Sequence, residues 1–248
     1  MGEIYYAAFH WDHPGSPPSP SPEDIAAAGE ILAAAAGAGW PVQTHSVTTS
    51  GLDLVFDAYE RANLHRPIRP LRWSVTHAEG ITAAHLERAR PLGVTVQLRS
   101  QGVIRAAASA SASASAAVPL RLLRDSGLSW GLGTDGTRAA QVNPFITLWW
   151  AVTGQSLGGD RTLAAPLRRE EALIAHTRSN AHLMFRENDL GALRPGLLAD
   201  LLVLDRDYLT VPEAEIKDIT PLVTMVGGRT VHGSLTSLLT CQHGNPAQ

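Results

Sequence analysis

The 248-residue sequence contains one cysteine, Cys241, and one lysine, Lys217. A single cysteine cannot close a disulfide within the chain, and it cannot build a zinc site from several thiolates. A single lysine leaves almost no candidate for a catalytic or carboxylated lysine. Chemistry that depends on thiols or amines is therefore not expected, and any catalytic groups must come from other side chains.

The chain also lacks a strong charge imbalance and a long apolar run. Its formal net charge is −3, which does not suggest a nucleic acid or an anionic membrane surface as a partner. The most apolar stretch, residues 25–40, is short and interrupted by Glu30, so no membrane span is expected. Glu3 stands where a signal peptide would carry basic residues. These absences predict a cytoplasmic protein.

Predicted strands alternate with predicted helices over the first three quarters of the chain. Strands are expected at five places, namely residues 4–9, 41–45, 71–77, 94–98 and 129–134. The predicted helices include one that starts at Ser21-Pro22 and runs to about residue 38, one over 82–90 capped by Thr82, and one from residue 169 to about 185. This alternation is typical of an α/β fold with a parallel sheet. An Ala/Ser-rich segment, residues 106–117, interrupts the pattern and is expected to be a mobile loop or a weak helix.

The pattern changes near residue 187. Short strands are predicted at residues 201–204, 222–226 and 229–231, and Gly227-Gly228 forms a hairpin turn between the last two. Because no long helices separate them, they predict a small β appendage. We therefore expect an α/β domain over 1–187, the appendage over 188–233 and a disordered tail over 234–248.

Three of the predicted strands end on residues that commonly bind metal ions: His45, His77 and Asp135. The carboxyl ends of parallel strands meet at one edge of a sheet, where α/β enzymes place their chemistry. Each residue alone has a structural explanation, a hydrogen-bonded histidine in the core or an aspartate that caps a helix. Three at the same topological position instead favour a divalent metal site, with zinc the most natural ion.

A set of motifs around these residues supports the prediction of a metal site. They are Gly39-Trp40 with Thr44-His45, Thr76-His77-Ala78-Glu79, Gly133-Thr134-Asp135-Gly136-Thr137-Arg138 with Asn143-Pro144, and Pro195-Gly196-x-x-Ala199-Asp200-Leu201-x-Val203-x-Asp205. Together with Val226-Gly227-Gly228-Arg229, the set resembles the C-terminal part of metal-dependent hydrolases of the amidohydrolase superfamily, in the amidohydrolase-3 branch.

The resemblance implies a (β/α)₈ TIM barrel, of which this chain holds strands four to eight, followed by the C-terminal portion of a small β-sandwich. It implies hydrolysis of a non-peptide carbon–nitrogen bond by a metal-activated water. His45, His77 and Asp135 are then the metal ligands, and Asp135 is also the catalytic proton shuttle. The implied partner is a small-molecule amide-type substrate.

Substrate-binding residues are expected around the same strand ends: Gln97, Arg138 and Asn143. The family's His-x-His pair after the first barrel strand has no match, because His10-x-x-His13 has different spacing. The lysine that bridges two metals in some members is also missing, so a single zinc or other divalent ion is expected.

These departures leave a second interpretation open. The chain is then a catalytically silent barrel fragment or pseudoenzyme that lacks the His-x-His half. In either case a partial barrel has two open strand edges, which favour self-association into a homo-oligomer. It also predicts that Trp149 and Trp150 lie in an exposed apolar patch.

Overall fold

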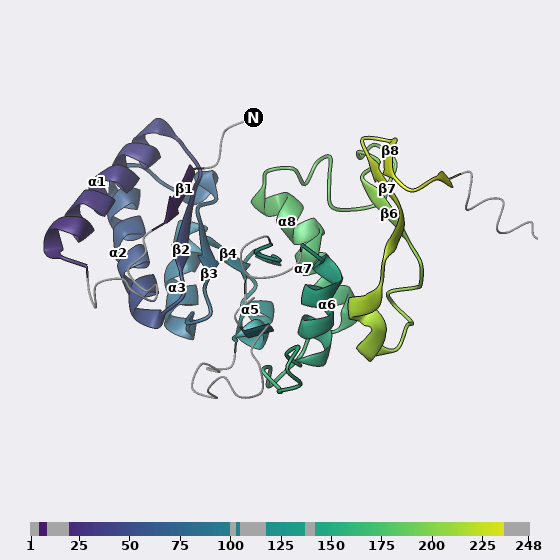
Figure 1. Ribbon diagram of the computed structural model, residues 1–248. Coiled ribbons are helices and arrows are strands. Elements are labelled where there is room, and N and C mark those ends of the chain that lie inside the picture. Colours follow the sequence, from purple (N-terminus) through teal and green to yellow (C-terminus); the bar gives the residue numbers. More distant parts are fainter. Residues whose placement is uncertain (1–4, 9–19, 100–102, 105–117, 137–141, 236–248) are drawn as a thin grey trace, which may run out of the picture.

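The computed structural model describes the backbone of residues 5–8 and, with side chains, residues 20–99, 103–104, 118–136 and 142–235 (Figure 1). The histidine pair His10 and His13, the Ala/Ser-rich segment 106–117, Arg138 and nearly all of the predicted tail lie outside the described residues. The predictions made for them therefore stay predictions.

A five-stranded parallel sheet forms the first part of the molecule (Figure 1). Its strands lie side by side in chain order: β1 Tyr5–Ala8, β2 Val42–Ser46, β3 Ser74–His77, β4 Thr95–Leu98 and β5 Trp130–Leu132. Every neighbouring pair is parallel. The five predicted strands and the α/β class are confirmed.

Helices lie between these strands in the sequence, and three more follow β5 (Figure 1). They are α1 Pro22–Ala38, α2 Thr49–His65, α3 Ala83–Leu92, α5 Leu120–Asp125, α6 Pro144–Thr153, α7 Arg169–His176 and α8 Arg178–Leu183. The predicted start of α1 is confirmed, because Ser21 and Asp24 form a reciprocal capping box there. In the part of the chain that the structure describes, none of the helices has the length and apolarity needed to cross a membrane.

Two predicted elements differ from the observed ones. The strand predicted over 71–77 begins only at Ser74, because Arg69–Leu71 forms a 3₁₀ turn, η1, and Arg72 follows in the left-handed region at φ 48°. The helix predicted from residue 169 to about 185 divides at Thr177, whose backbone angles of −123° and −81° are not helical. The Thr177 hydroxyl donates to Leu173 O at 2.7 Å and so competes with the helical pattern.

The predicted exposure of Trp149 and Trp150 is wrong. Their exposed fractions are 5% and 0%. Helix α6 is covered by α7 and by the 3₁₀ helix η3, Glu213–Asp218, which comes from the far end of the sequence. Trp150 also donates its indole N–H to Thr162 Oγ1 at 2.9 Å. Residues beyond the parallel sheet thus supply the cover that sequence reasoning did not anticipate.

The second sheet is antiparallel and has three strands, β6 Leu201–Leu204, β7 Pro221–Val226 and β8 Arg229–His232. The predicted hairpin turn is confirmed, with Gly227 at φ 55° and Gly228 at φ 78°. Asp200 accepts the Gly227 N–H at 2.6 Å and Asp205 accepts the Thr220 N–H at 2.9 Å. Asp200 therefore stabilises the hairpin turn, and Asp205 joins the end of β6 to the start of β7.

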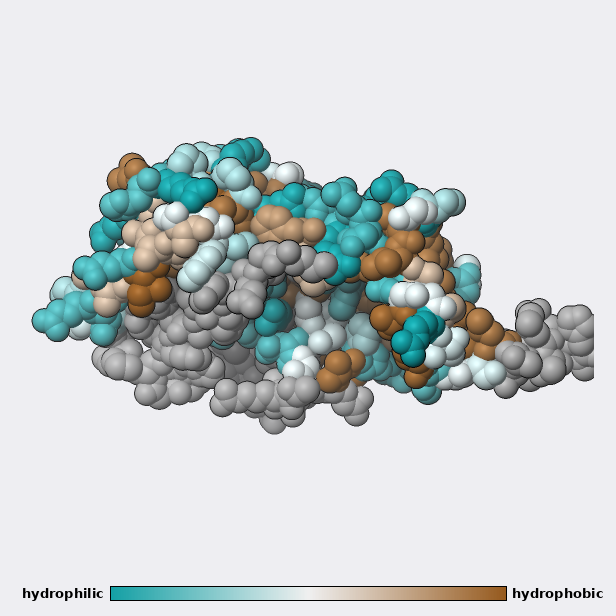
Figure 2. Space-filling view, turned by 90° about the horizontal axis from the view of Figure 1, so that it is seen from above, coloured by the Kyte–Doolittle hydropathy of each residue, from teal (hydrophilic) through white to brown (hydrophobic). Residues whose placement is uncertain are grey.

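Apolar side chains lie on the surface of this small sheet, at the right in Figure 2. The exposed members are Leu202, Leu222, Val226 and Val231. Whether the sheet is part of a larger sandwich, as the sequence predicts, and whether the domain boundaries stand at 187 and 233 remain predictions.

An ion pair joins the start of β3 to the segment after α8, and it predicts a pH dependence of stability. Arg72 contacts both carboxylate oxygens of Glu187, at 2.6 and 3.1 Å, and also donates to His182 O at 2.8 Å. The hydrogen bonds from Arg72 lower the pKa of Glu187 from 4.5 to about 2. Since the native state holds Glu187 ionised to lower pH than the unfolded state, this contribution is complete above pH 4.5 and is lost as the pH falls toward 2.

We expect Glu187→Gln to lower the free energy of unfolding by about 1–2 kcal/mol at pH 7, less than a fully buried pair would give because both side chains are partly exposed. The difference in the free energy of unfolding between this variant and the wild type should shrink as the pH falls from 4.5 to 2. Urea denaturation at each pH measures this difference. A difference that stays constant over this range would show that the pair does not set the pKa of Glu187.

Candidate active site

The two predicted histidines lie beside each other at the carboxyl edge of the parallel sheet. His45 is in β2 and His77 ends β3, and the strand register pairs Ser46 with His77. Their ring centroids are 4.2 Å apart at an interplanar angle of 56°. His45 is 6% exposed, so its imidazole lies inside the protein beside the more accessible His77.

Asp135 also lies near His77, although it follows β5, which is two strands away from β3 in the sheet. Its Oδ2 lies 4.0 Å from Nε2 of His77. His77, Ala78 and Asp135 all have positive φ, at 67°, 57° and 48°. This region is costly for residues other than glycine, and such strain is found preferentially at functional sites. The fold thus holds two of the three predicted ligands in unfavourable backbone conformations.

These three side chains have the donor chemistry that zinc uses, two imidazoles and one carboxylate. Ligand atoms that bind one ion at about 2.0–2.2 Å lie about 3–4 Å from each other, and the His77–Asp135 separation falls within that range. Within the described ranges, however, no three His, Cys, Asp or Glu side chains are arranged so that they could hold a metal ion. His77 and Asp135 therefore lie at a separation that suits two ligands of one divalent ion. The three predicted ligands together do not form a complete metal site in this structure.

Gln97 lies one strand further along, opposite Thr76 in the β3–β4 register. Its side chain donates to Ser74 Oγ at 3.4 Å and accepts from Arg99 at 3.3 Å. Arg99 in turn lies 3.7 Å from Asp135 Oδ1. Arg99 was not among the predicted site residues, although residues two apart at a strand end lie on the same face and Gln97 was predicted there.

The side chain of Asn143 makes contacts that hold the fold together. Its side chain accepts the Phe145 N–H at 2.9 Å, which makes it the N-cap of α6, and it donates to Lys217 O at 3.4 Å. These contacts use its amide to begin α6 and to attach η3. The prediction that Asn143 and Arg138 bind substrate is not tested, since Arg138 lies outside the described residues.

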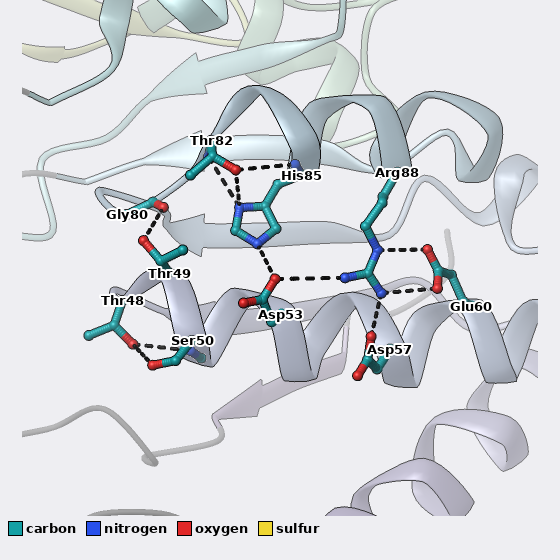
Figure 3. Close-up of polar contacts among 11 residues, drawn as sticks. Thr48, Thr49, Ser50, Asp53, Asp57, Glu60, Gly80, Thr82, His85 and Arg88 are labelled. Atoms are coloured by element: carbon teal, nitrogen blue, oxygen red, sulfur yellow. Dashed lines mark hydrogen bonds and ion pairs between the residues drawn. The ribbon is translucent and has the colours of Figure 1, made fainter.

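The loop after His77 is fastened to the loop after His45 through its backbone. Ala78 N–H donates to Ser46 O and Gly80 N–H donates to Val47 O, both at 2.8 Å. Thr49 adds a hydrogen bond to Gly80 O at 2.9 Å (Figure 3). A Cβ at Gly80 would lie 2.5 Å from the backbone nitrogen of Thr49, so only glycine allows this approach. The contact fixes the two histidine-bearing loops relative to each other.

Glu79 lies within this fastened loop. Its Oε1 is 3.9 Å from Nδ1 of His77, and its side chain is only 19% exposed. Glu79 belongs to the Thr76-His77-Ala78-Glu79 motif, but no role was predicted for it. Spacing alone gave no signal, because the residue's position depends on the left-handed backbone at His77 and Ala78.

Polar side chains of α2 and α3, the helices that follow the two histidine-bearing loops, form a cluster (Figure 3). Thr82 N–H donates to Nδ1 of His85 at 3.1 Å, so the ring proton of neutral His85 is on Nε2, which lies 2.9 Å from Asp53 Oδ1. Arg88 pairs with Glu60 at 2.8 Å and with Asp57, and these hydrogen bonds raise the pKa of Arg88. The cluster was not predicted beyond the Thr82 cap, and it joins the two helices that follow the histidine strands.

A sequence model described as the amidohydrolase family matches residues 5–232. Among curated proteins, the N-substituted formamide deformylase of Arthrobacter pascens is 25% identical over 216 residues, which cover 80% of this chain and 38% of that protein. The Arabidopsis thaliana protein LONG AFTER FAR-RED 3 is 27% identical over 210 residues, covering 80% of this chain and 35% of that protein.

Among solved structures, an uncharacterized metal-dependent hydrolase from Pyrococcus horikoshii superposes with a TM-score of 0.61 at 23% identity. The match covers 77% of this chain and 39% of that one. The chain therefore spans well under half the length of these relatives. At this level of identity the superposition supports the fold alone.

Proposed function

The chain belongs to the amidohydrolase family, and on that premise we propose that it hydrolyses a non-peptide carbon–nitrogen bond of a small molecule by means of a metal-activated water. The observation that carries the proposal is the position of His77 at the carboxyl edge of the parallel sheet, with the His45 ring 4.2 Å away on the neighbouring strand and Asp135 Oδ2 4.0 Å from its Nε2. That edge is where α/β enzymes place their reactive groups.

The roles follow from the chemistry of the side chains. His45 and His77 would hold a single divalent ion, zinc or another, with Asp135 as the third ligand. Such an ion, when bound, polarises the substrate carbonyl and lowers the pKa of a bound water toward neutrality. Asp135 takes the proton of the attacking water and returns it to the leaving nitrogen. Arg99 lies beside Asp135 and contacts Gln97, and both side chains carry N–H donors for polar groups of the substrate.

We further propose that β1 to β5 correspond to strands four to eight of a TIM barrel, and that β6 to β8 are the C-terminal part of the β-sandwich. Five parallel strands in chain order, joined by helices, support the first assignment, and the antiparallel order β6-β7-β8 supports the second. A partial barrel of this kind would pair its open edges with a second copy of the chain. A cytoplasmic location remains part of the proposal.

The first substrates to test are N-substituted formamides and related N-acyl amides, because one relative is named as a deformylase of that class. The assay measures release of the amine product by the whole chain, together with formate for the formamides, with and without added zinc. We expect turnover to depend on the metal. Bound metal without turnover of any amide would favour the catalytically silent interpretation.

Metal content tests the ligand assignment independently of turnover. We expect the purified chain to retain zinc or a similar ion in substoichiometric amounts, because affinity depends on groups that orient the ligands as well as on the ligands. His77→Ala and His45→Ala should lower this content, measured by elemental analysis. His65→Ala, at the exposed end of α2, is the matched control. Equal metal in all four proteins would contradict the assignment.

A further inference from the structure

His77 lies between two carboxylates that face different nitrogens of its ring. Glu79 Oε1 is 3.9 Å from Nδ1, and Asp135 Oδ2 is 4.0 Å from Nε2. A neutral imidazole carries its proton on one nitrogen only, and the hydrogen bond made by that nitrogen decides which one it is. The two carboxylates therefore compete for the single ring proton.

From this arrangement we infer that Glu79 is a positioning residue. Its carboxylate accepts the Nδ1–H of His77 and leaves the Nε2 lone pair directed toward Asp135. The inference rests on the proposed function for its consequence, since Nε2 is then the nitrogen available to the metal ion. Carboxylates behind metal-binding histidines commonly fix the tautomer and raise the basicity of the ligand in this way.

The surroundings of Glu79 support this assignment. Its Oε2 is buried, and it has no hydrogen-bond partner in the part of the chain that the structure describes. A buried carboxylate with one oxygen lacking a donor is costly, so a hydrogen bond to its other oxygen, Oε1, stabilises the group. His77 is the ion-pair partner that the described residues place near this carboxylate. A shift of about 1 Å in either side chain would convert the 3.9 Å separation into a charge-assisted hydrogen bond of about 2.8 Å.

The loop that carries Glu79 is held without help from the Glu79 side chain. Backbone hydrogen bonds from Ala78 and Gly80 to Ser46 and Val47, together with Thr49, fix the chain on both sides of it. Figure 3 shows the Thr49–Gly80 contact and the neighbouring cap at Thr82. Substitutions at residue 79 therefore change the carboxylate and leave the loop in place.

The geometry also separates a positioning role from direct metal binding. Asp135 is on the Nε2 side of the ring and Glu79 is on the Nδ1 side. An ion shared by Nε2 and Asp135 is consequently beyond the reach of Glu79. A glutamine at this position keeps an amide oxygen that can accept the Nδ1–H, whereas an alanine does not.

The test uses the whole chain with two readouts. Nitrogen-15 NMR of the imidazoles in the metal-free protein reports the tautomer of His77, with the signal assigned from His77→Ala. Zinc titration against a chromogenic chelator reports affinity. In the wild type we expect the Nδ1–H tautomer. Glu79→Ala should give a mixture of tautomers and weaken zinc binding by about 10- to 100-fold, and Glu79→Gln should restore most of both.

The matched control is Glu87→Ala, which removes the same group from an exposed position on α3 and should change neither readout. An unchanged tautomer and affinity in Glu79→Ala would overturn the inference. So would a loss in Glu79→Gln as large as in Glu79→Ala, because that indicates direct ligation by the carboxylate. The His77 tautomer could change in Glu79→Ala while the wild-type chain binds no zinc. That result would support the positioning role of Glu79 and contradict the proposed function.

Discussion

Replacing Asp135 with asparagine should lower the rate of amide hydrolysis by about 10²- to 10⁴-fold, the range typical for loss of a general base. Asparagine keeps the shape of the side chain and an oxygen that can face His77, and it removes the group that takes the proton from water. The substitution suits this position for a second reason. Asp135 lies at φ 48°, and asparagine tolerates the left-handed region about as well as aspartate does.

The expected loss should therefore appear in kcat with little change in thermal stability. It is measured on the zinc-loaded chain with an N-substituted formamide, together with a melting curve. Asp125→Asn provides the control, since that aspartate pairs with Arg124 on the exposed end of α5. A variant at residue 135 that hydrolyses amides at the wild-type rate would remove Asp135 from the proposed mechanism.

The position of the candidate site could be predicted because it depends on strand ends. His45 lies near the end of a recognisable strand, His77 ends one and Asp135 follows one, and parallel pairing then brings these strand ends to one edge. That inference needs only the order of the strands. It does not give the conformation of the loops, so the left-handed backbone at His77 and Ala78 and the resulting place of Glu79 were not foreseen.

Contacts between distant parts of the chain could not be predicted from the sequence either. Arg99, after β4, reaches Asp135 after the neighbouring strand β5, and Arg72 reaches Glu187 more than a hundred residues away. The break at Thr177 arises from a single hydroxyl that bonds the helix backbone. Hydrophobic periodicity carries no information about such long-range or side-chain-specific partners, and it correctly predicted only the elements that they join.

Sequence reasoning failed most clearly at Trp150, where the largest stability effect is now expected. Trp150→Ala should lower the free energy of unfolding by about 3–5 kcal/mol, the usual cost of removing a fully buried aromatic ring. The indole is 0% exposed and lies in α6, which η3 and α7 cover. The loss therefore combines a cavity in the core with weaker attachment of the C-terminal segment.

Trp150→Phe separates packing from hydrogen bonding. Phenylalanine keeps most of the buried ring area but cannot donate to Thr162, and the loss of one such bond costs about 0.5–1.5 kcal/mol. Trp40→Ala makes the same chemical change at a side chain that is 44% exposed, and it should cost much less than Trp150→Ala. Urea denaturation, followed by circular dichroism, measures all three variants. If Trp150→Ala were no more destabilising than Trp40→Ala, α6 would not be packed against η3 in solution, and the patch expected from the sequence would be exposed after all.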